Sequence, residues 1–291
     1  MNDEGNRERR VKIIATLGPA SASEAVVREL VAAGADGFRL NGAHVQPAQI
    51  GGLVELVRAV EREAGRPLAV LFDLAGPKLR VSRDVARVEL AAGQMVTVGA
   101  AGSGAMVRIE GFDPAVECPV GTRISLHDGK VALRARAVRE GVVEAEVVVG
   151  GEVAGGMGVN LPDVETSLPS LTEHDLACLA AAQEADIDLL ALSFVRRAEE
   201  VADLRGRVAA HSISLPIIAK LEKAQAVAAA NLESILNTAD MVMIARGDLG
   251  AETAPEQVPV LQKSILRRAR SRGVPVITAT EMLESMIREV R

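Results

Sequence analysis

Aromatic side chains are almost absent from this sequence, which has 291 residues but no tryptophan, no tyrosine and only four phenylalanines. Proteins that bind single-stranded nucleic acids stack the bases on aromatic rings, and nucleic-acid-binding domains usually carry a basic surface. The formal net charge of −6 has the wrong sign for a polyanionic partner. We therefore expect no nucleic acid among the partners of this protein.

Cysteines and long apolar runs are also scarce. The two cysteines, Cys118 and Cys178, are too few for a disulfide framework or a zinc site. The N-terminal segment MNDEGNRERR lacks the apolar core of a signal peptide, and no apolar run reaches the length that spans a membrane. These absences predict a cytoplasmic protein without a membrane partner.

The sequence does contain a series of apolar, β-branched runs, which recur roughly every 25 to 35 residues, the spacing of strand–helix units. The runs are VKIIATL from Val11, GFRLN from Gly37, LAVLFD from Leu68, DLLALSF from Asp188, PIIAK from Pro216, MVMIAR from Met241 and PVITAT from Pro275. Between them, segments such as SEAVVRELVAAG have the apolar spacing of helices. The pattern predicts an α/β protein with a TIM-type (β/α)8 barrel that is incomplete, because an eighth strand is missing.

Residues 80–158 interrupt this rhythm. Their short segments alternate apolar and polar residues, as in MVTVG, VALRARAV and VVEAEVVVG, and Gly, Asp and Pro separate them. That alternation is typical of antiparallel strands. We therefore predict a first barrel segment over residues 1–79, an inserted small antiparallel β domain over 80–158, and a second, truncated barrel segment over 159–291.

A lysine and two acidic residues follow two of the predicted strands. Lys220 and Glu222 end the run PIIAKLE, and Asp248 follows the run MVMIA. The C-terminal ends of parallel barrel strands meet on one rim, so these side chains should converge there. Mg²⁺ binds carboxylate oxygens together with water and substrate phosphate, and a nearby lysine can bind the phosphate. The residues alone therefore indicate phosphoryl-transfer or enolate chemistry.

Eight motifs extend this picture along nearly the whole chain. In order they are KIIATLGPAS (12–21), RLNGAH (39–44), DLAGPKLR (73–80), GVNLP (158–162), LSFVR (192–196), KLE (220–222), ARGDLG (245–250) and TATEMLESMI (278–287). In residues, order and spacing they resemble the motifs of pyruvate kinases. The last barrel strand and the C-terminal regulatory domain of that family have no counterpart in the sequence, so we expect a chain truncated before them.

The resemblance implies the reaction and its catalytic groups. The expected reaction is transfer of the phosphoryl group of phosphoenolpyruvate (PEP) to ADP, followed by protonation of enolpyruvate to pyruvate. Glu222 and Asp248 match the family's ligands of Mg²⁺ or Mn²⁺. Lys220 and Arg39 match the cations that neutralise the phosphoryl oxygens during transfer, and Thr280 matches the hydroxyl beside the enolate.

The resemblance also assigns substrate and nucleotide contacts. The backbone N–H groups of Gly247 and Asp248 would receive the substrate carboxylate, and Arg39 and Thr280 would also contact the substrate. The positions that match the family's nucleotide contacts, for ADP or ATP, are Asn41, His44, Arg80 and Asp128.

The expected site for a monovalent cation departs from the family pattern. Many pyruvate kinases bind K⁺ through residues that match Asn41 and Asp73, but their serine and threonine positions hold Ala43 and Leu74 in this chain. Lys78 stands where K⁺-requiring members have a glutamate. Its ammonium group carries the charge of K⁺ and can lie beside Asp73, so we expect an enzyme that does not require K⁺.

Two other functions remain open. A truncated chain can bind metal or PEP without catalysis and need a partner segment to close its barrel, and the two open edges of a seven-stranded sheet favour self-association. A metal-dependent pyruvate aldolase of the same superfamily would keep Glu222, Asp248 and a pyruvate pocket. An aldolase has no use for a nucleotide lid, however, so residues 80–158 argue against it.

Overall fold

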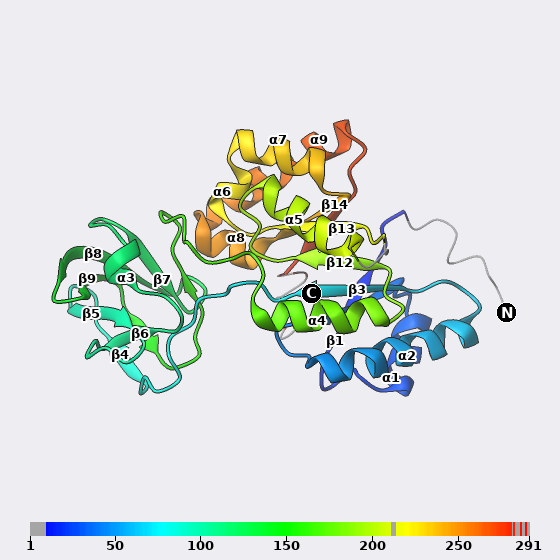
Figure 1. The fold of residues 1–291 in the computed structure, drawn as a ribbon, viewed down its shortest axis with the longest axis horizontal. Coiled ribbons are helices and arrows are strands. Elements are labelled where there is room, and N and C mark those ends of the chain that lie inside the picture. Colours follow the sequence, from blue (N-terminus) through cyan, green and yellow to red (C-terminus); the bar gives the residue numbers. More distant parts are fainter. Residues whose placement is uncertain (1–9, 211–213, 281, 283–285, 287–288, 290–291) are drawn as a thin grey trace.

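The computed structural model describes residues 10–210 and 214–280, together with residues 282, 286 and 289. A curled parallel sheet surrounded by helices forms one part of the molecule, and a separate antiparallel sheet extends from it to one side (Figure 1). The chain enters the antiparallel part after β3 (Ala69–Leu74) and leaves it before α4 (Glu173–Glu184). The predicted fold class, an incomplete TIM-type barrel with an inserted small antiparallel β domain, is confirmed.

Seven strands form the parallel sheet of the described residues, in the order β1-β2-β3-β12-β13-β14-β15. The remaining bounds are β1 (Ile14–Leu17), β2 (Gly37–Asn41), β12 (Leu189–Leu192), β13 (Ile217–Leu221), β14 (Met241–Ala245) and β15 (Val276–Ala279). The central strands β3, β12, β13 and β14 are almost entirely buried. This burial on both faces explains why they read as continuous apolar runs in the sequence rather than as alternating ones.

Helices lie around the parallel sheet and share its apolar core. They are α1 (Glu24–Ala32), α2 (Pro47–Ala64), α4, α5 (Ala198–Ala209), α6 (Ala224–Val227), α7 (Ala229–Thr238), α8 (Arg246–Glu252), the 3-10 helix η1 (Pro255–Gln257) and α9 (Val258–Ser271). Local sequence sets several ends: α2 stops at Gly65, which adopts a φ of 62°, and α4 starts with a capping box between Thr172 and Asp175. No helix among the described residues is long and apolar enough to cross a bilayer.

The antiparallel part has its own core. Its larger sheet has the order β11-β7-β8-β9-β5-β6, and the pair β10-β4 lies apart from that sheet. The bounds are β4 (Val88–Leu90), β5 (Met95–Ala100), β6 (Val107–Ile109), α3 (Pro114–Glu117), β7 (Arg123–Leu126), β8 (Val131–Arg139), β9 (Val142–Val149), β10 (Gly151–Val153) and β11 (Val159–Asn160). Along β8 and β9, buried residues alternate with more exposed ones, and the buried set packs into a cluster separate from that of the barrel.

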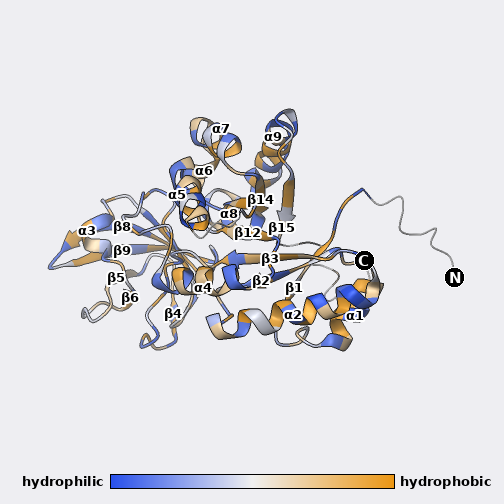
Figure 2. Ribbon diagram, turned by 45° about the vertical axis from the view of Figure 1, so that its right-hand side comes forward, coloured by the Kyte–Doolittle hydropathy of each residue, from blue (hydrophilic) through white to orange (hydrophobic). Residues whose placement is uncertain are grey.

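The two outer strands of the parallel sheet are less protected than the central ones. Every residue of β15 and most residues of β1 are partly exposed. In Figure 2, hydrophobic residues follow the strands and one side of the surrounding helices. Within the described residues, no further strand pairs with the outer edge of β1 or of β15. Such edges leave backbone N–H and C=O groups without a sheet partner.

Candidate active site

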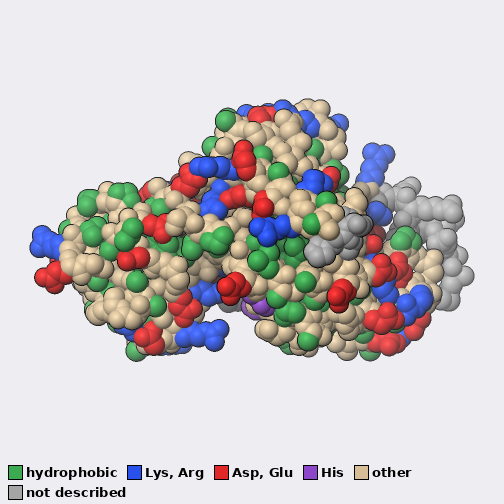
Figure 3. Space-filling model, in the orientation of Figure 1, with side chains coloured by type: hydrophobic (Ala, Val, Ile, Leu, Met, Phe, Trp, Pro, Cys, Tyr) green, Lys and Arg blue, Asp and Glu red, His purple; other side chains and the backbone are tan. Residues whose placement is uncertain are grey.

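The residues predicted to act in catalysis and to bind substrate and metal lie in or just beyond the C-terminal halves of the parallel strands. Arg39 lies in β2, Asp73 in β3 and Lys220 in β13, while Glu222 directly follows β13. Thr280 directly follows β15, and Gly247 and Asp248 lie in the first turn of α8, which follows β14. Figure 3 shows charged side chains of both signs along the junction between the barrel and the antiparallel part. The parallel topology therefore brings these residues to one rim.

Lys220 is the buried cation of this rim. Its Nζ atom lies 3.2 Å from Asp73 Oδ2 and 3.0 Å from Glu222 Oε1, and it donates a hydrogen bond of 2.7 Å to Ser193 Oγ. Burial alone would lower the pKa of Lys220, but the charges of Glu222 and Asp73 outweigh burial, so its pKa is raised. The side chain therefore remains a protonated ammonium between two carboxylates.

Glu222 is held in one orientation from both sides. Its Oε1 atom faces Lys220, and its Oε2 atom accepts a 2.7 Å hydrogen bond from the backbone N–H of Phe194. Burial raises the pKa of Glu222; Lys220 lowers it, while the negative charges of Asp248 and Asp73 raise it further. The influence of Asp248 shows that the two predicted metal ligands lie near each other, and the raised pKa shows that additional positive charge would stabilise the ionised carboxylate.

A second cation, Arg39, contacts the same oxygen of Asp73 as Lys220 does. Its Nε and Nη2 atoms lie 2.7 Å and 2.6 Å from Asp73 Oδ2, and its Nη1 atom donates to Thr16 Oγ1 at 3.3 Å. Asp73 also accepts a hydrogen bond from Ser193 Oγ at 3.2 Å. Asp73 therefore fixes both predicted phosphoryl-binding cations, Arg39 and Lys220, side by side.

Lys78 does not lie where the sequence predicted it. Its Nζ atom lies 3.0 Å from Asp248 Oδ1 and 3.6 Å from Asp128 Oδ1, and its ion pairs in the described part of the chain do not include Asp73. The expectation of an ammonium beside Asp73 is therefore wrong for this structure, because Arg39 and Lys220 already surround that carboxylate. Lys78 instead joins the turn after β7 to the first turn of α8.

Gly247 and Thr280 touch each other at the end of the rim. A Cβ atom at Gly247 would lie 2.9 Å from Thr280 Cγ2, so any larger residue there would push against the threonine. Thr280 has a φ of 69°, an unusual value for a β-branched residue, and its carbonyl accepts a 3.0 Å hydrogen bond from Arg246 Nε. Backbone strain of this kind persists only where neighbouring contacts hold the residue.

The residues predicted to contact the nucleotide fall into two groups. Asn41 and His44 lie at and just after the end of β2, where Asn41 is in register with Asp73 and its Oδ1 atom accepts from the N–H of Ala43 at 3.2 Å. Arg80 and Asp128 belong to the antiparallel part. Arg80 Nη1 donates to the carbonyl of Gly156 at 3.0 Å, and Asp128 adopts a φ of 54° in the turn after β7. No hydrogen bond or ion pair of the described residues joins the two groups directly.

The carboxylates of the rim fit a Mg²⁺ or Mn²⁺ ion whose remaining coordination positions would be filled by water and substrate. Among the described residues, no group of three or more His, Cys, Asp or Glu side chains is placed to hold a metal by itself. Mg²⁺ commonly binds through one or two carboxylates, with water and substrate phosphate in its other positions. Glu222 and Asp248 provide two such carboxylates, and burial, followed by the negative charges of Asp248 and Asp73, raises the pKa of Glu222 although Lys220 lies beside it.

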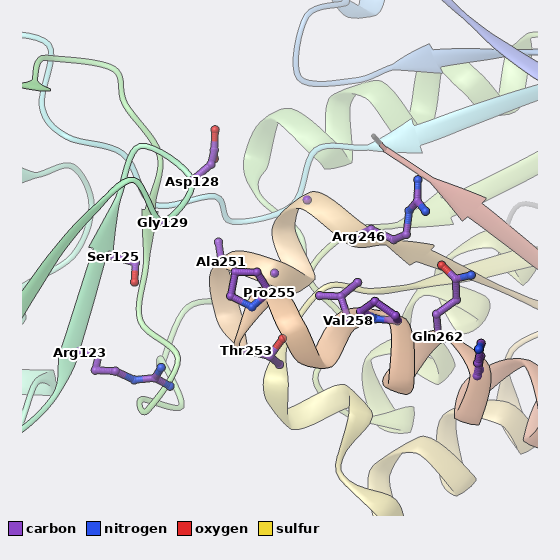
Figure 4. Close-up of a pocket in the computed structure, with 14 residues that line it drawn as sticks. Arg123, Ser125, Asp128, Gly129, Arg246, Ala251, Thr253, Pro255, Val258 and Gln262 are labelled. Carbon is purple, nitrogen blue, oxygen red and sulfur yellow. The ribbon is translucent and has the colours of Figure 1, made fainter. Parts of the chain in front are cut away.

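A cavity of about 430 Å³ opens beside these residues, between the antiparallel part and helices α8 and α9. Figure 4 shows Ser125, Asp128 and Gly129 on one side, and Ala251, Pro255 and Val258 on the other. Arg246 and Gly247 line it as well. The first turn of α8 is therefore reachable from a space large enough for a small metabolite.

Sequence reasoning assigned no role to Ser193 and Phe194, although the motif LSFVR contains both. Ser193 links Lys220 to Asp73, and Phe194, with a φ of 54°, directs its backbone N–H to Glu222. Their position directly after the apolar run of β12 was the available signal, because residues after barrel strands lie on the functional rim.

Comparisons with known proteins agree with this geometry. The family model described as "Pyruvate kinase, barrel domain" matches residues 8–291. "Pyruvate kinase 2" of Synechocystis sp. is 38% identical over 291 residues, covering 97% of this chain and 49% of the relative. The pyruvate kinases of Methylorubrum extorquens and Mycobacterium tuberculosis are each 41% identical, over 97% of this chain and 59% and 60% of their own lengths. The chain thus spans about half the length of the curated relatives it matches, and it belongs to the pyruvate kinase family.

Proposed function

We propose that this chain carries the site that transfers the phosphoryl group of PEP to ADP, giving pyruvate and ATP, as a Mg²⁺-dependent enzyme of glycolysis in the cytoplasm. The observation that supports this most is the buried Lys220 ammonium, held between Asp73 and Glu222 at the strand ends. The negative charge of Asp248 in turn influences Glu222. A buried cation beside paired carboxylates suits a reaction in which phosphoryl oxygens and an enolate share a divalent ion.

In the proposed reaction, the bond between the enol oxygen and phosphorus breaks, and a new bond forms from an oxygen of the ADP β-phosphate to the same phosphorus. Lys220 and Arg39 would offset the negative charge of the phosphoryl oxygens during this transfer, because Asp73 fixes both cations. A divalent ion held by Glu222 and Asp248 would supply Lewis-acid stabilisation of the enolate and phosphoryl oxygens.

The remaining assignments concern the substrate and the nucleotide. The backbone N–H groups of Gly247 and Asp248 would bind the substrate carboxylate, and Thr280, in contact with the Gly247 position, would lie beside the enolate carbon that accepts a proton. Asn41, His44, Arg80 and Asp128 would contact the nucleotide. Residues 80–158 would then act as a lid between barrel segments 1–79 and 159–291.

The test is an assay that couples pyruvate formation to an optical signal while PEP, ADP and Mg²⁺ are varied. Phosphotransfer requires that pyruvate appear only when all three are present. Pyruvate formed from a hydroxyacid substrate without ADP would identify the aldolase alternative instead. Binding of PEP and metal without pyruvate would leave the non-catalytic alternative.

A specific observation favours that non-catalytic alternative. The outer strands β1 and β15 are partly exposed, and no other strand of the described residues pairs with their outer edges, so these edges can pair with a strand of another copy or of a partner segment. A chain of this kind would bind metal and PEP but remain inactive until its barrel is closed. Sedimentation velocity at increasing protein concentration would show the self-association that these edges favour, and a monomer at all concentrations would count against it.

We also propose that the site works without K⁺. The support is the Lys78 ammonium, which places one positive charge between Asp248 and Asp128. Asn41 and Asp73, the expected K⁺ ligands, lie across the rim, where Arg39 and Lys220 already supply positive charge. In this arrangement Lys78 would replace a monovalent cation beside Asp248 rather than beside Asp73.

Lys78→Glu is expected to make ligand binding depend on K⁺. The substitution gathers three carboxylates around one point, and an added monovalent cation would reduce their repulsion. Binding of Mn²⁺ and oxalate, a mimic of enolpyruvate, should weaken in buffer containing only tetramethylammonium and recover with K⁺, while the unmutated chain should respond to neither change. Lys130→Glu, a charge reversal two residues from Asp128, is the control. A strong K⁺ effect on the unmutated chain would contradict the proposal.

A further inference from the structure

A buried carboxylate at the end of α8 has no role in the site described above. The Glu252 side chain is fully buried, and its Oε1 atom accepts hydrogen bonds from Lys223 Nζ at 2.6 Å and from Asn160 Nδ2 at 2.9 Å. Lys223 lies in the loop after β13, and Asn160 lies in β11 of the antiparallel part. One oxygen atom therefore joins three segments that are distant in the sequence.

Stability of the fold does not account for this cluster. Glu252 Oε2 and Asn160 Oδ1 are buried without a hydrogen-bond partner among the described residues, and an unpaired buried oxygen lowers stability. Buried ion pairs can often be replaced by apolar residues without loss of stability. A carboxylate in the last turn of a helix also opposes the helix dipole. The arrangement is costly, so a functional reason for it is required.

The cluster connects the two segments that carry the proposed metal ligands. Lys223 directly follows Glu222, and Glu252 lies one turn after Asp248 in the same short helix. The ion pair between Lys223 and Glu252 therefore ties α8 to the end of β13. It is a direct side-chain link between these two segments, in addition to the contacts that Lys220 makes with Glu222 and Lys78 with Asp248.

The antiparallel part, which includes β11, meets α8 at both of its ends. Asn160 contacts Glu252 at the C-terminal end, and Asn160 is paired in register with Ser125 of β7. In the turn that follows β7, Asp128 shares Lys78 with Asp248, in the first turn of α8. A Cβ atom at Gly129, the next residue of that turn, would lie 3.7 Å from Ala251 Cα (Figure 4). Helix α8 is thus bound to the end of β13 on one side and to the antiparallel part on the other.

We propose that Glu252 is a positioning residue, which fixes α8 against the end of β13 through Lys223 and against the antiparallel part through Asn160. By holding α8 in this place, Glu252 sets the distance between Asp248 and Glu222. The part of this inference that concerns metal rests on the proposed function. The part that concerns the placement of α8 does not.

The experiment compares the full chain with Glu252→Gln, Asn160→Ala and the control Glu233→Gln. Glutamine has nearly the shape of glutamate, so Glu252→Gln should fold, and it removes only the charge opposite Lys223. Glu233 pairs with Arg268 on the outer helices α7 and α9, which makes its substitution a chemically identical change away from the site. Two quantities are measured for each protein: amide hydrogen exchange of residues 246–252 without ligand, and the Mn²⁺ dissociation constant by electron paramagnetic resonance.

We expect Glu252→Gln to exchange faster over residues 246–252 and to bind Mn²⁺ about tenfold more weakly, the effect usual for residues that orient metal ligands. Asn160→Ala should also speed exchange there, and Glu233→Gln should change neither quantity. Unchanged exchange in Glu252→Gln, or faster exchange with unchanged Mn²⁺ affinity, would overturn the proposal, as would equal effects of Glu233→Gln. A lowered melting temperature alone would show a structural role and would also overturn it.

Failure of the proposed function gives a different result. If the unmutated chain binds no Mn²⁺, the metal site is refuted, and hydrogen exchange alone then decides the role of Glu252. Faster exchange confined to Glu252→Gln and Asn160→Ala would still support the placement of α8, whereas exchange equal to that of the unmutated chain would reject it.

Discussion

Replacing Lys220 with methionine is expected to lower the free energy of unfolding by about 3–5 kcal/mol, the usual effect of removing one partner from a buried ion pair. Lys220 is only 7% exposed and contacts the carboxylates of Asp73 and Glu222. Methionine fills much of the same volume but leaves Glu222 without its nearest cation. Urea unfolding followed by circular dichroism measures the change.

Two further variants make this prediction specific. Lys12→Met, at a side chain that is 73% exposed and pairs with Asp36, should change the stability by less than about 1 kcal/mol. Adding Glu222→Gln to Lys220→Met should restore part of the lost stability, because a neutral amide is less costly to bury than an unpaired carboxylate. Equal losses for Lys12→Met and Lys220→Met would show that the buried network is not the cause.

Glu222→Gln and Asp248→Asn are each expected to weaken the joint binding of Mn²⁺ and oxalate by more than about tenfold, since losing a direct ligand should cost more than losing a residue that orients one. Both substitutions keep the side-chain shape and remove the charge that attracts the metal. Calorimetric titration of oxalate in the presence of Mn²⁺ measures the effect, and the unmutated chain is the reference.

The matched control for these variants is Asp240→Asn. Asp240 precedes β14 at the opposite end of the same strands, where it pairs with Arg205 and accepts a hydrogen bond from the N–H of Ile217. The Asp240→Asn substitution should leave oxalate binding unchanged. If Glu222→Gln and Asp248→Asn bind oxalate as well as Asp240→Asn does, the metal assignment is wrong.

The strands of the barrel were predictable because their burial is written in the sequence as continuous apolar runs. The observed ends differ from the predicted ones mainly at the margins: β1 begins at Ile14 rather than Val11, where the side chains of Val11 and Ile13 are exposed. An apolar residue at an exposed edge has the same sequence signature as a buried one. Sequence pattern therefore predicts the existence of a strand better than its ends.

The rim itself was only partly predictable. Parallel topology places Lys220, Glu222 and Asp248 together whatever the details of packing, so their convergence follows from strand order. Which charged side chains form ion pairs with one another does not follow from strand order. Lys78 and Asp248 are 170 residues apart, and their pairing depends on how the segment after β3 lies against the first turn of α8. The cluster of Glu252, Lys223 and Asn160 depends on how the antiparallel part meets the barrel.

On the proposed function, the position of Lys78 would link the conformation of the lid to the occupancy of the metal site. One ammonium group holds a carboxylate of the lid, Asp128, and a carboxylate of the barrel, Asp248. If residues 80–158 act as the proposed lid, its opening would break one of these pairs, and a divalent ion at Asp248 would compete with the same ammonium. By thermodynamic reciprocity, the factor by which lid opening would change the affinity for the ion equals the factor by which ion binding would change the equilibrium between the open and closed lid. The two events therefore share one coupling free energy, carried by a single side chain.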